Sequence, residues 1–106
     1  AHPAVAEAAA VGIPHEIKGE VAWVFCALVP GREPSDELAA EVMAVAASEL
    51  GKAFRPERIL FVRALPKTRS AKIVRRAVRA KALGMDPGDL SSLENPESLD
   101  EIADVV

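Results

Sequence analysis

Apolar residues in the first third of the chain are spaced as in β-strands. A continuous apolar run over residues 21–29 predicts a strand that is buried on both faces. The polar residues 14–19 precede it and include a glycine, so they predict the turn of a hairpin. Residues 4–12 are expected to begin as a short helical turn and to run into the first strand, which Ile13-Pro14 should end.

Later in the chain, apolar residues recur every three or four positions, which is typical of helices that pack on a core. The first such segment, residues 36–50, has Ser35 as a candidate N-cap and Gly51 as a candidate C-terminal glycine. A second helix is expected over about residues 70–82. A short amphipathic helix is expected over residues 97–105.

These elements predict an α+β fold, in which a sheet of about three strands contains a β-hairpin and is flanked by helices. The third strand is the apolar run 59–62. A chain of 106 residues suffices for one modest core, so residues 1–106 are expected to form one domain. We expect no membrane span and a cytoplasmic location, because no apolar run is long enough and the first residues lack a secretory signal pattern.

Cysteine and histidine are too few and too dispersed to predict a metal site. The single Cys26 lies inside the apolar run, where a buried core thiol is expected rather than a nucleophile. His2 and His15 lie far apart in the sequence, without ligand-like spacing to Cys26. No metal ligand is therefore predicted.

The net charge of -3 conceals a strong segregation of charge. Residues 1–51 carry eight acids and two bases, residues 52–81 carry eleven bases and one acid, and residues 86–106 carry seven acids and no base. The acidic total argues against a protein that coats nucleic acid. The basic middle still permits a focused site for a phosphate or a carboxylate.

Residues 67–81 concentrate this basic character, with seven basic side chains and no acid. Within them, Lys72 lies where the loop after Leu65-Pro66 is expected to meet a helix start. A lysine ammonium on its flexible stem can be delivered between two anions and can stabilise charge that develops there. A basic helix face is also typical of a solvated surface, and the residue types alone leave both interpretations open.

The order of these residues resembles the last signature motif of the adenylate-forming superfamily, Leu-Pro-Lys-Thr-x-Ser-Gly-Lys-Ile-x-Arg-Arg. Here the residues are Leu65-Pro66-Lys67-Thr68-Arg69-Ser70-Ala71-Lys72-Ile73-Val74-Arg75-Arg76. The superfamily comprises AMP-forming acyl-CoA synthetases, adenylation domains of peptide synthetases and luciferases. The resemblance begins at His2-Pro3 and covers nearly the whole chain. The tail 89–96 is similar to that of acetyl-CoA synthetase-like members.

The resemblance implies the C-terminal lid domain of an AMP-forming acyl-CoA synthetase, a ligase. Its partner would be its own large N-terminal domain, which binds ATP, Mg²⁺ and the acid and is, with the hinge, absent from these residues. The family lysine falls on Lys72 and contacts the substrate carboxylate and the α-phosphate during adenylation. The lid then rotates and presents another face for attack of the CoA thiol on the acyl-adenylate. Alone, the domain is expected to be inactive.

For that second face, the resemblance points to Gly19, Glu20 and Arg55, at the channel for CoA. A glycine lets a backbone approach the thin pantetheine arm, and a guanidinium can take phosphate oxygens in a bidentate way. The alternatives are that Gly19 is only a turn glycine and that Arg55 is a surface cation. Both alternatives stay open.

Two departures from the family pattern change what is expected. The usual glycine before the catalytic lysine is Ala71, which restricts the backbone of the loop that delivers Lys72. Residues 46–48 are Ala-Ala-Ser, where many relatives carry bases, so a phosphate contact from that helix is in doubt.

Three further hypotheses concern the basic residues, and a fourth concerns the chain as a whole. In the family, acetylation of the lysine at Lys72 stops adenylation, because it removes the charge that bridges two anions. Arg75, Arg76 and Arg79 are each expected to form a solvated face that aids solubility and docking. The alternative function is a nucleic-acid binding module, which lacks support because no aromatic residue is interleaved to stack a base. A third possible function of the chain, after the synthetase domain and the nucleic-acid module, is that of a free-standing regulator that acts on another large domain.

Overall fold

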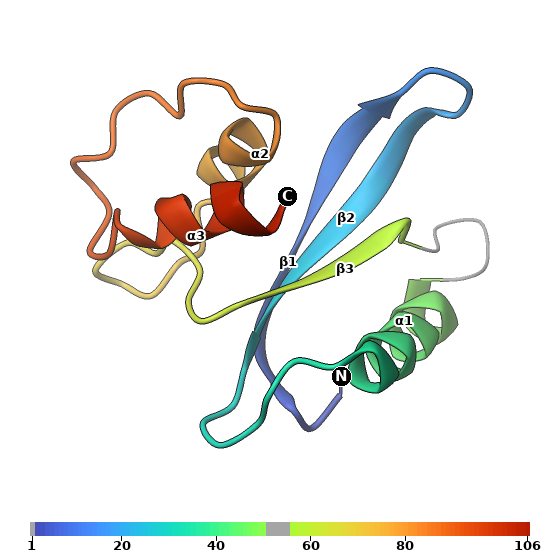
Figure 1. Ribbon diagram of the computed structural model, residues 1–106. Helices are drawn as coiled ribbons and strands as arrows, with labels where there is room; N and C mark the ends of the chain where they lie inside the picture. Colours follow the sequence, from blue (N-terminus) through green and yellow to red (C-terminus); the bar gives the residue numbers. More distant parts are fainter. Residues whose placement is uncertain (1, 51–55) are drawn as a thin grey trace.

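A three-stranded mixed sheet forms the centre of the molecule, a computed structural model that describes residues 2–50 and 56–106 (Figure 1). Strands β1 (Val5–His15) and β2 (Gly19–Leu28) form an antiparallel hairpin. Strand β3 (Arg58–Val62) pairs with β2 in parallel, so the sheet order is β1-β2-β3. A parallel pair needs a crossover connection, and α1 (Asp36–Leu50) lies within it.

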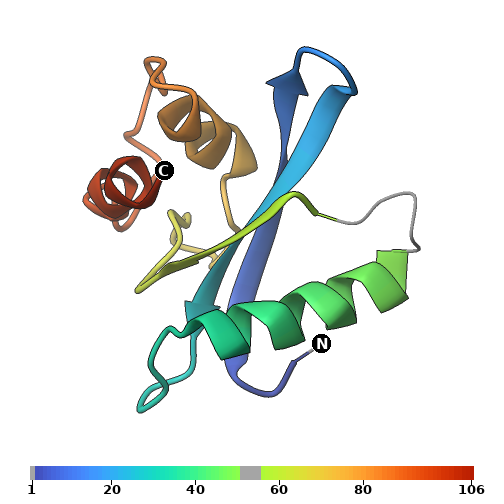
Figure 2. The same ribbon diagram turned by 45° about the vertical axis from the view of Figure 1, so that its right-hand side comes forward.

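Helices cover both faces of the sheet. Figure 2 shows α1 on one face, with α2 (Arg75–Ala82) and α3 (Ser98–Val105) on the other. The predicted α+β fold, with three strands, a hairpin and flanking helices, is confirmed. The short C-terminal helix is also confirmed, and it begins one residue later than expected.

The central strand β2 is buried on both faces, as its continuous apolar run predicts. Val24 and Cys26 pack with Leu38 and Val42 of α1. Phe25, between them, belongs to a larger cluster on the opposite face and is fully buried. Burial raises the pKa of the Cys26 thiol to about 11, so the thiol stays protonated and the expected core cysteine is confirmed.

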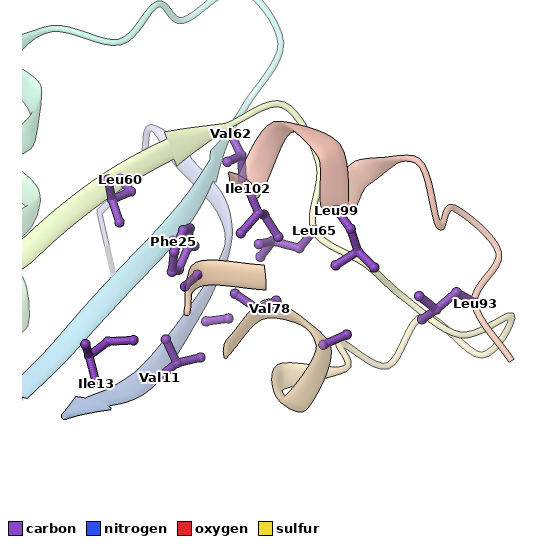
Figure 3. Close-up of a cluster of buried hydrophobic side chains, with 13 residues drawn as sticks. Val11, Ile13, Phe25, Leu60, Val62, Leu65, Val78, Leu93, Leu99 and Ile102 are labelled. Carbon is purple, nitrogen blue, oxygen red and sulfur yellow. The ribbon is translucent and has the colours of Figure 1, made fainter. Parts of the chain in front are cut away.

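The larger cluster joins the sheet to α2 and α3 (Figure 3). Side chains of β1, β2 and β3 meet those of the two helices there, together with Leu65 and Leu93 from the connecting loops. Leu65 and Leu93 are therefore buried although both lie in loops. Figure 3 labels these members of the larger cluster: Val11, Ile13, Phe25, Leu60, Val62, Leu65, Val78, Leu93, Leu99 and Ile102.

The prediction for residues 4–12 is right about the strand and wrong about the helical turn and about the end at Ile13-Pro14. Strand β1 starts at Val5 without a helical turn and continues through Pro14 to His15. Proline is tolerated there because β1 is an edge strand, with a partner on one side only. A register shift between Val5 and Glu7 changes the face that the residues present: Val5 packs beside α1, whereas Ala9 joins the larger cluster.

The N-terminus of α1 agrees with its predicted capping residue. The Ser35 hydroxyl accepts a hydrogen bond from the Leu38 N–H at 3.0 Å. Asp36 and Glu37 occupy the first turn, where they complement the helix dipole. The expected terminal glycine, Gly51, lies outside the described residues. No helix in the described part of the chain is long and apolar enough to cross a membrane.

We predict that Phe25→Ala destabilises the fold by about 3–5 kcal/mol, because it leaves a cavity where sheet and helices meet. Urea denaturation of the 106-residue chain, followed by Trp23 fluorescence, measures the change. Ile17→Ala is the control, since Ile17 is 90% exposed and its loss should cost less than about 0.5 kcal/mol. Equal costs for the two variants would contradict the core described here.

Candidate functional site

The motif loop, residues 65–74, folds as a small hairpin before α2. The Thr68 N–H donates to the Lys72 carbonyl at 3.0 Å, and the Ala71 N–H donates to the Thr68 carbonyl at 2.9 Å. Lys67 and Ile73 form an antiparallel bridge below this turn. Lys72 therefore projects from the exposed tip of a closed loop, three residues before α2 begins.

The expected start of the second helix near Ser70 is consequently wrong. Helix α2 begins at Arg75, and no side chain caps it. Backbone groups of Ala71, Lys72 and Val74 bond within the loop instead; the Val74 N–H, for example, donates to the Pro66 carbonyl at 3.0 Å. The helical spacing of Ile73 and Val74 misled the prediction, because both pack on the larger cluster from the loop.

Ala71 has φ of 66°, in the left-handed region that favours glycine. Among the described residues, it is the one non-glycine residue with positive φ. The family motif has glycine at this position, and the backbone geometry gives the reason. The Ala71 side chain thus restricts the turn that carries Lys72 and costs about 1–2 kcal/mol of steric energy.

The base of the motif loop is held by residues far away in the sequence. The Lys67 N–H donates to Asn95 Oδ1 at 2.8 Å, and the Lys67 carbonyl accepts from the Glu94 N–H at 2.8 Å. The Lys67 ammonium forms an ion pair with Glu7 of β1, with Nζ and Oε1 2.7 Å apart. Asn95 and Glu7 carry no local signal in the sequence, because they lie 28 and 60 residues from Lys67.

Apolar contacts fix the same base. Leu65 and Pro66, which open the motif, are fully buried. Figure 3 shows Leu65 beside Leu99 and Ile102 of α3, within the larger cluster. The loop therefore has an immobilised base and an exposed tip.

The seven basic residues of this stretch divide into two groups. Besides Lys67, the Arg76 guanidinium donates to the Pro87 and Asp89 carbonyls, and Arg79 Nε donates to the Gly12 carbonyl at 2.7 Å. Arg76 and Arg79 thus tie parts of the chain together, which corrects the expectation of a merely solvated face. Within residues 2–50 and 56–106, no acidic side chain pairs with the other four, Arg69, Lys72, Arg75 and Lys81.

Two other predicted site residues, Gly19 and Glu20, lie at the far end of the hairpin. Gly19 is in the β1-β2 turn with φ of 82°, and a Cβ built on it would meet no atom within 4 Å. Its positive φ explains this glycine as a turn residue, whereas its exposure leaves the CoA role untested. Glu20 folds over Gly12, and Arg55 lies outside the described residues. The motif loop is not brought together with this turn (Figure 1).

The distance between the two places follows from strand length. Glu7 contacts the motif loop and His15 ends β1 at the turn, eight residues further on. At about 3.3 Å per residue, this separation is roughly 26 Å along the strand. The domain therefore presents two separate surfaces, one at each end of the hairpin.

The contacts of polar side chains near the β1-β2 turn were not predicted from the sequence. His15 Nδ1 accepts hydrogen bonds from the Ile17 and Lys18 N–H groups, both at 3.1 Å. Trp23 Nε1 donates to Glu57 at 3.0 Å, and the Arg58 guanidinium lies 4.7 Å from the centre of the Trp23 ring. The contacts of Trp23 with Glu57 and Arg58 join residues 34 and 35 positions apart, so sequence spacing gave no signal for them.

The fold and the motif loop together define a small α+β domain that exposes one lysine on a closed loop. The family model for the AMP-binding enzyme C-terminal domain matches residues 1–72. The chain therefore belongs to the family of AMP-binding enzyme C-terminal domains.

Curated relatives support this assignment over the full length of the chain. An acetyl-coenzyme A synthetase of Methanothrix soehngenii is 51% identical over 106 residues, which are 100% of this chain and 16% of that protein. A 3-hydroxypropionyl-coenzyme A synthetase of Sulfurisphaera tokodaii is 48% identical over 105 residues, which are 99% of this chain and 16% of that protein. The chain thus spans about one sixth of the length of these relatives.

Solved structures agree. An acyl-CoA synthetase of Brucella canis has a TM-score of 0.68 and 44% identity, covering 74% of this chain and 14% of its own. An acetoacetyl-CoA synthetase from Streptomyces lividans has a TM-score of 0.78 and covers 97% of this chain and 16% of its own. At 20% identity the second likeness shows the fold alone.

The strained position of Ala71 leads to a prediction on stability. We expect Ala71→Gly to be neutral or to stabilise the chain by up to about 1 kcal/mol, because lost steric strain outweighs the added entropy of the unfolded backbone. Ala71→Val should destabilise the chain by more than about 1 kcal/mol, since a branched side chain tolerates positive φ poorly. Chemical denaturation measures both. An unchanged stability of Ala71→Val would contradict the assigned backbone conformation.

Proposed function

We propose that this chain is the mobile C-terminal domain of an AMP-forming acyl-CoA synthetase. Its Lys72 supplies a positive charge during adenylation of a carboxylic acid. The domain then reorients so that its other end faces the CoA thiol for thioester formation. The whole enzyme would use ATP, Mg²⁺ and CoA, with ATP, Mg²⁺ and the acid held by its large N-terminal domain.

The observation that carries this proposal is the state of Lys72. It is exposed at the tip of a loop whose base is anchored, and no acidic group of the described residues neutralises it. A surface lysine on a helix would not need such a scaffold. The family match includes this residue, and curated relatives that match the chain over 99–100% of its length are named acetyl- and 3-hydroxypropionyl-coenzyme A synthetases.

The chemistry suits a lysine ammonium. When a carboxylate attacks the α-phosphate, two anions approach each other and negative charge grows on the phosphate oxygens. A point charge with three N–H donors lowers this repulsion and stabilises the growing charge. Because the charge is needed for adenylation alone, a domain that withdraws it leaves room for the thiol in the second step.

The second surface would lie at the β1-β2 turn, with Gly19 and Glu20. Both residues are exposed there, and the turn is roughly 26 Å from the motif loop along β1. A rigid sheet with one functional surface at each end supports a rotating domain, because a rotation can exchange the two ends at one active site. Arg55 keeps its proposed role toward CoA phosphates.

Nucleic-acid binding fits the described structure less well. Lys67, Arg76 and Arg79 donate to groups of the chain itself, so the basic stretch does not present seven unengaged charges. A phosphate backbone would need a continuous track of such charges. We therefore retain the acyl-CoA synthetase domain as the single proposed function.

Acetylation of Lys72 would regulate the same site. The side chain is exposed at the loop tip, so a modifying enzyme can reach it. Acetylation removes its positive charge, and the adenylation step should stop while the fold is kept.

The assignment of Lys72 predicts asymmetric kinetics in the full-length enzyme. Lys72→Ala should slow adenylation by about 10²-fold or more, because one preorganised charge is lost from the transition state. Thioester formation from supplied acyl-adenylate should change little. Exchange of pyrophosphate into ATP measures the first step, and consumption of acyl-adenylate with CoA measures the second.

Lys81→Ala is the matched control for this experiment. It removes another basic residue of the stretch, in α2 rather than in the loop, and should leave both steps unchanged. Equal losses in the two steps with Lys72→Ala would refute the assigned role. The isolated 106-residue chain should neither hydrolyse ATP nor form a thioester.

A further inference from the structure

Asn95 contacts the motif loop at two backbone groups that lie on either side of a proline. Its Nδ2 donates to the Leu65 carbonyl at 2.8 Å, and its Oδ1 accepts from the Lys67 N–H at 2.8 Å. The side-chain amide thus uses one donor and one acceptor, much as a neighbouring strand would. Pro66, between these groups, has no N–H to donate. The Leu65 carbonyl and the Lys67 N–H are therefore both paired with the one Asn95 side chain.

We propose that Asn95 is a positioning residue for the adenylation step, because it holds the loop that presents Lys72. This inference rests on the proposed function of Lys72. Asn95 itself stands in the acidic tail, beyond the residues that the family model matches. It touches the loop backbone and acts on the reaction through Lys72.

The tail segment that carries Asn95 is itself well supported. The Asn95 carbonyl accepts hydrogen bonds from the Ser98 hydroxyl at 2.8 Å and from the Ser98 N–H at 3.1 Å, at the start of α3. Leu93, two residues before, is buried in the larger cluster. The side-chain amide is therefore presented by a rigid segment and is not free to follow the loop.

The contacts continue from Asn95 to Lys72. Lys67 is bound by the Asn95 amide, and Thr68 next to it forms an antiparallel bridge with Leu93. The Thr68 N–H in turn donates to the Lys72 carbonyl, and Thr68 Oγ1 accepts from the Lys72 N–H at 3.3 Å. A shift of the loop base must consequently displace the backbone from which the Lys72 side chain projects.

Catalysis is sensitive to such a displacement. An error of about 1 Å in the placement of a reacting group can cost about 10²-fold in rate. Loss of the Asn95 amide leaves the hydrophobic anchor Leu65 and the Glu7 ion pair in place, so the loop is loosened rather than released. We expect about a 10-fold loss of adenylation.

The test uses the full-length enzyme with Asn95→Ala. The kcat of pyrophosphate exchange should fall about 10-fold with little change in KM for ATP, because the large domain binds ATP. The rate of thioester formation from supplied acyl-adenylate should stay within about 2-fold. A general loss of folding would lower both steps, so the split between them identifies a positioning role.

Glu101→Ala is the matched control. Glu101 also stands in the tail, and it also accepts a backbone N–H, that of Arg63, at 2.7 Å, with a second contact to Arg63 Nε at 3.3 Å. Glu101→Ala removes both contacts, which join the tail to the residue after β3 and lie outside the motif loop. Like Asn95→Ala, it thus removes two polar contacts of the tail. Adenylation should be unchanged in this variant.

Asn95→Asp separates the two contacts. The carboxylate keeps an acceptor for the Lys67 N–H and loses the donor to the Leu65 carbonyl. Adenylation should fall in this variant while thioester formation stays within about 2-fold, because an ionised carboxylate faces the Leu65 carbonyl with no proton to donate. An adenylation rate equal to that of the unaltered enzyme would overturn the role of the Leu65 contact.

Limited trypsin digestion provides a readout that does not depend on activity. Trypsin cleaves after Arg69 and Lys72, and Asn95→Ala should raise the cleavage rate there at least about 3-fold, because a loosened loop opens more often. Glu101→Ala should not raise it. Unchanged cleavage in Asn95→Ala, or unchanged adenylation despite faster cleavage, would overturn the proposal.

These results separate failure of this inference from failure of the proposed function. If Lys72→Ala slows both steps equally, the adenylation role of Lys72 fails, and with it the claim that Asn95 serves that step. If Lys72→Ala is selective and Asn95→Ala is not, the function stands and the positioning role of Asn95 is overturned.

Discussion

The backbone of Lys67 is the point on which the site depends. Its N–H and its carbonyl both pair with the segment 94–95, and its side chain reaches Glu7 on β1. One residue thus connects the tail, the sheet and the motif loop. Because hydrogen bonds weaken steeply with angle and distance, three such contacts define the position of the loop base closely. The position of the exposed tip, which carries Lys72, is therefore determined by the position of this base.

The same arrangement explains how a small domain can carry two surfaces. Fully buried side chains on both faces of β2 make the hairpin a rigid element. One end carries the motif loop and the other carries the turn at Gly19. The rotation proposed for this domain requires rigidity of this kind, because the whole domain would have to turn without changing the geometry at either end.

Much of the fold could be predicted from the sequence, because the signals were local. The apolar run of β2, the Ser35 cap and the spacing in α1 and α3 each follow from residues next to one another. The prediction failed where distant residues decide the backbone. Residues 70–74 were expected to begin a helix, yet backbone groups of Ala71, Lys72 and Val74 bond to residues 66–68 and close a hairpin. The start of strand β1 was wrongly predicted as a helical turn because its alanines favour a helix. Pairing with β2 overrides that propensity.

The candidate site likewise has residues that local sequence signals revealed and residues that they did not. Lys72 could be found because its motif is contiguous, and the positive φ of Ala71 gives a physical reason for the glycine of the family pattern. Asn95, Glu94 and Glu7 could not be found, because folding alone brings them to Lys67. Arg76 and Arg79 were expected to be solvated for a related reason: their acceptors are backbone carbonyls, which no pattern of side chains reveals.

The central claim is that the motif loop has a fixed base and an exposed tip, whose outermost residues are Arg69 and Ser70. Residue-resolved amide hydrogen exchange of the unaltered chain by NMR tests it most directly. The amides of Lys67, Thr68 and Val74, which donate to Asn95, Lys72 and Pro66, should exchange at least about 10²-fold more slowly than those of Arg69 and Ser70. Exchange at Lys67 as fast as at Ser70 would contradict the account.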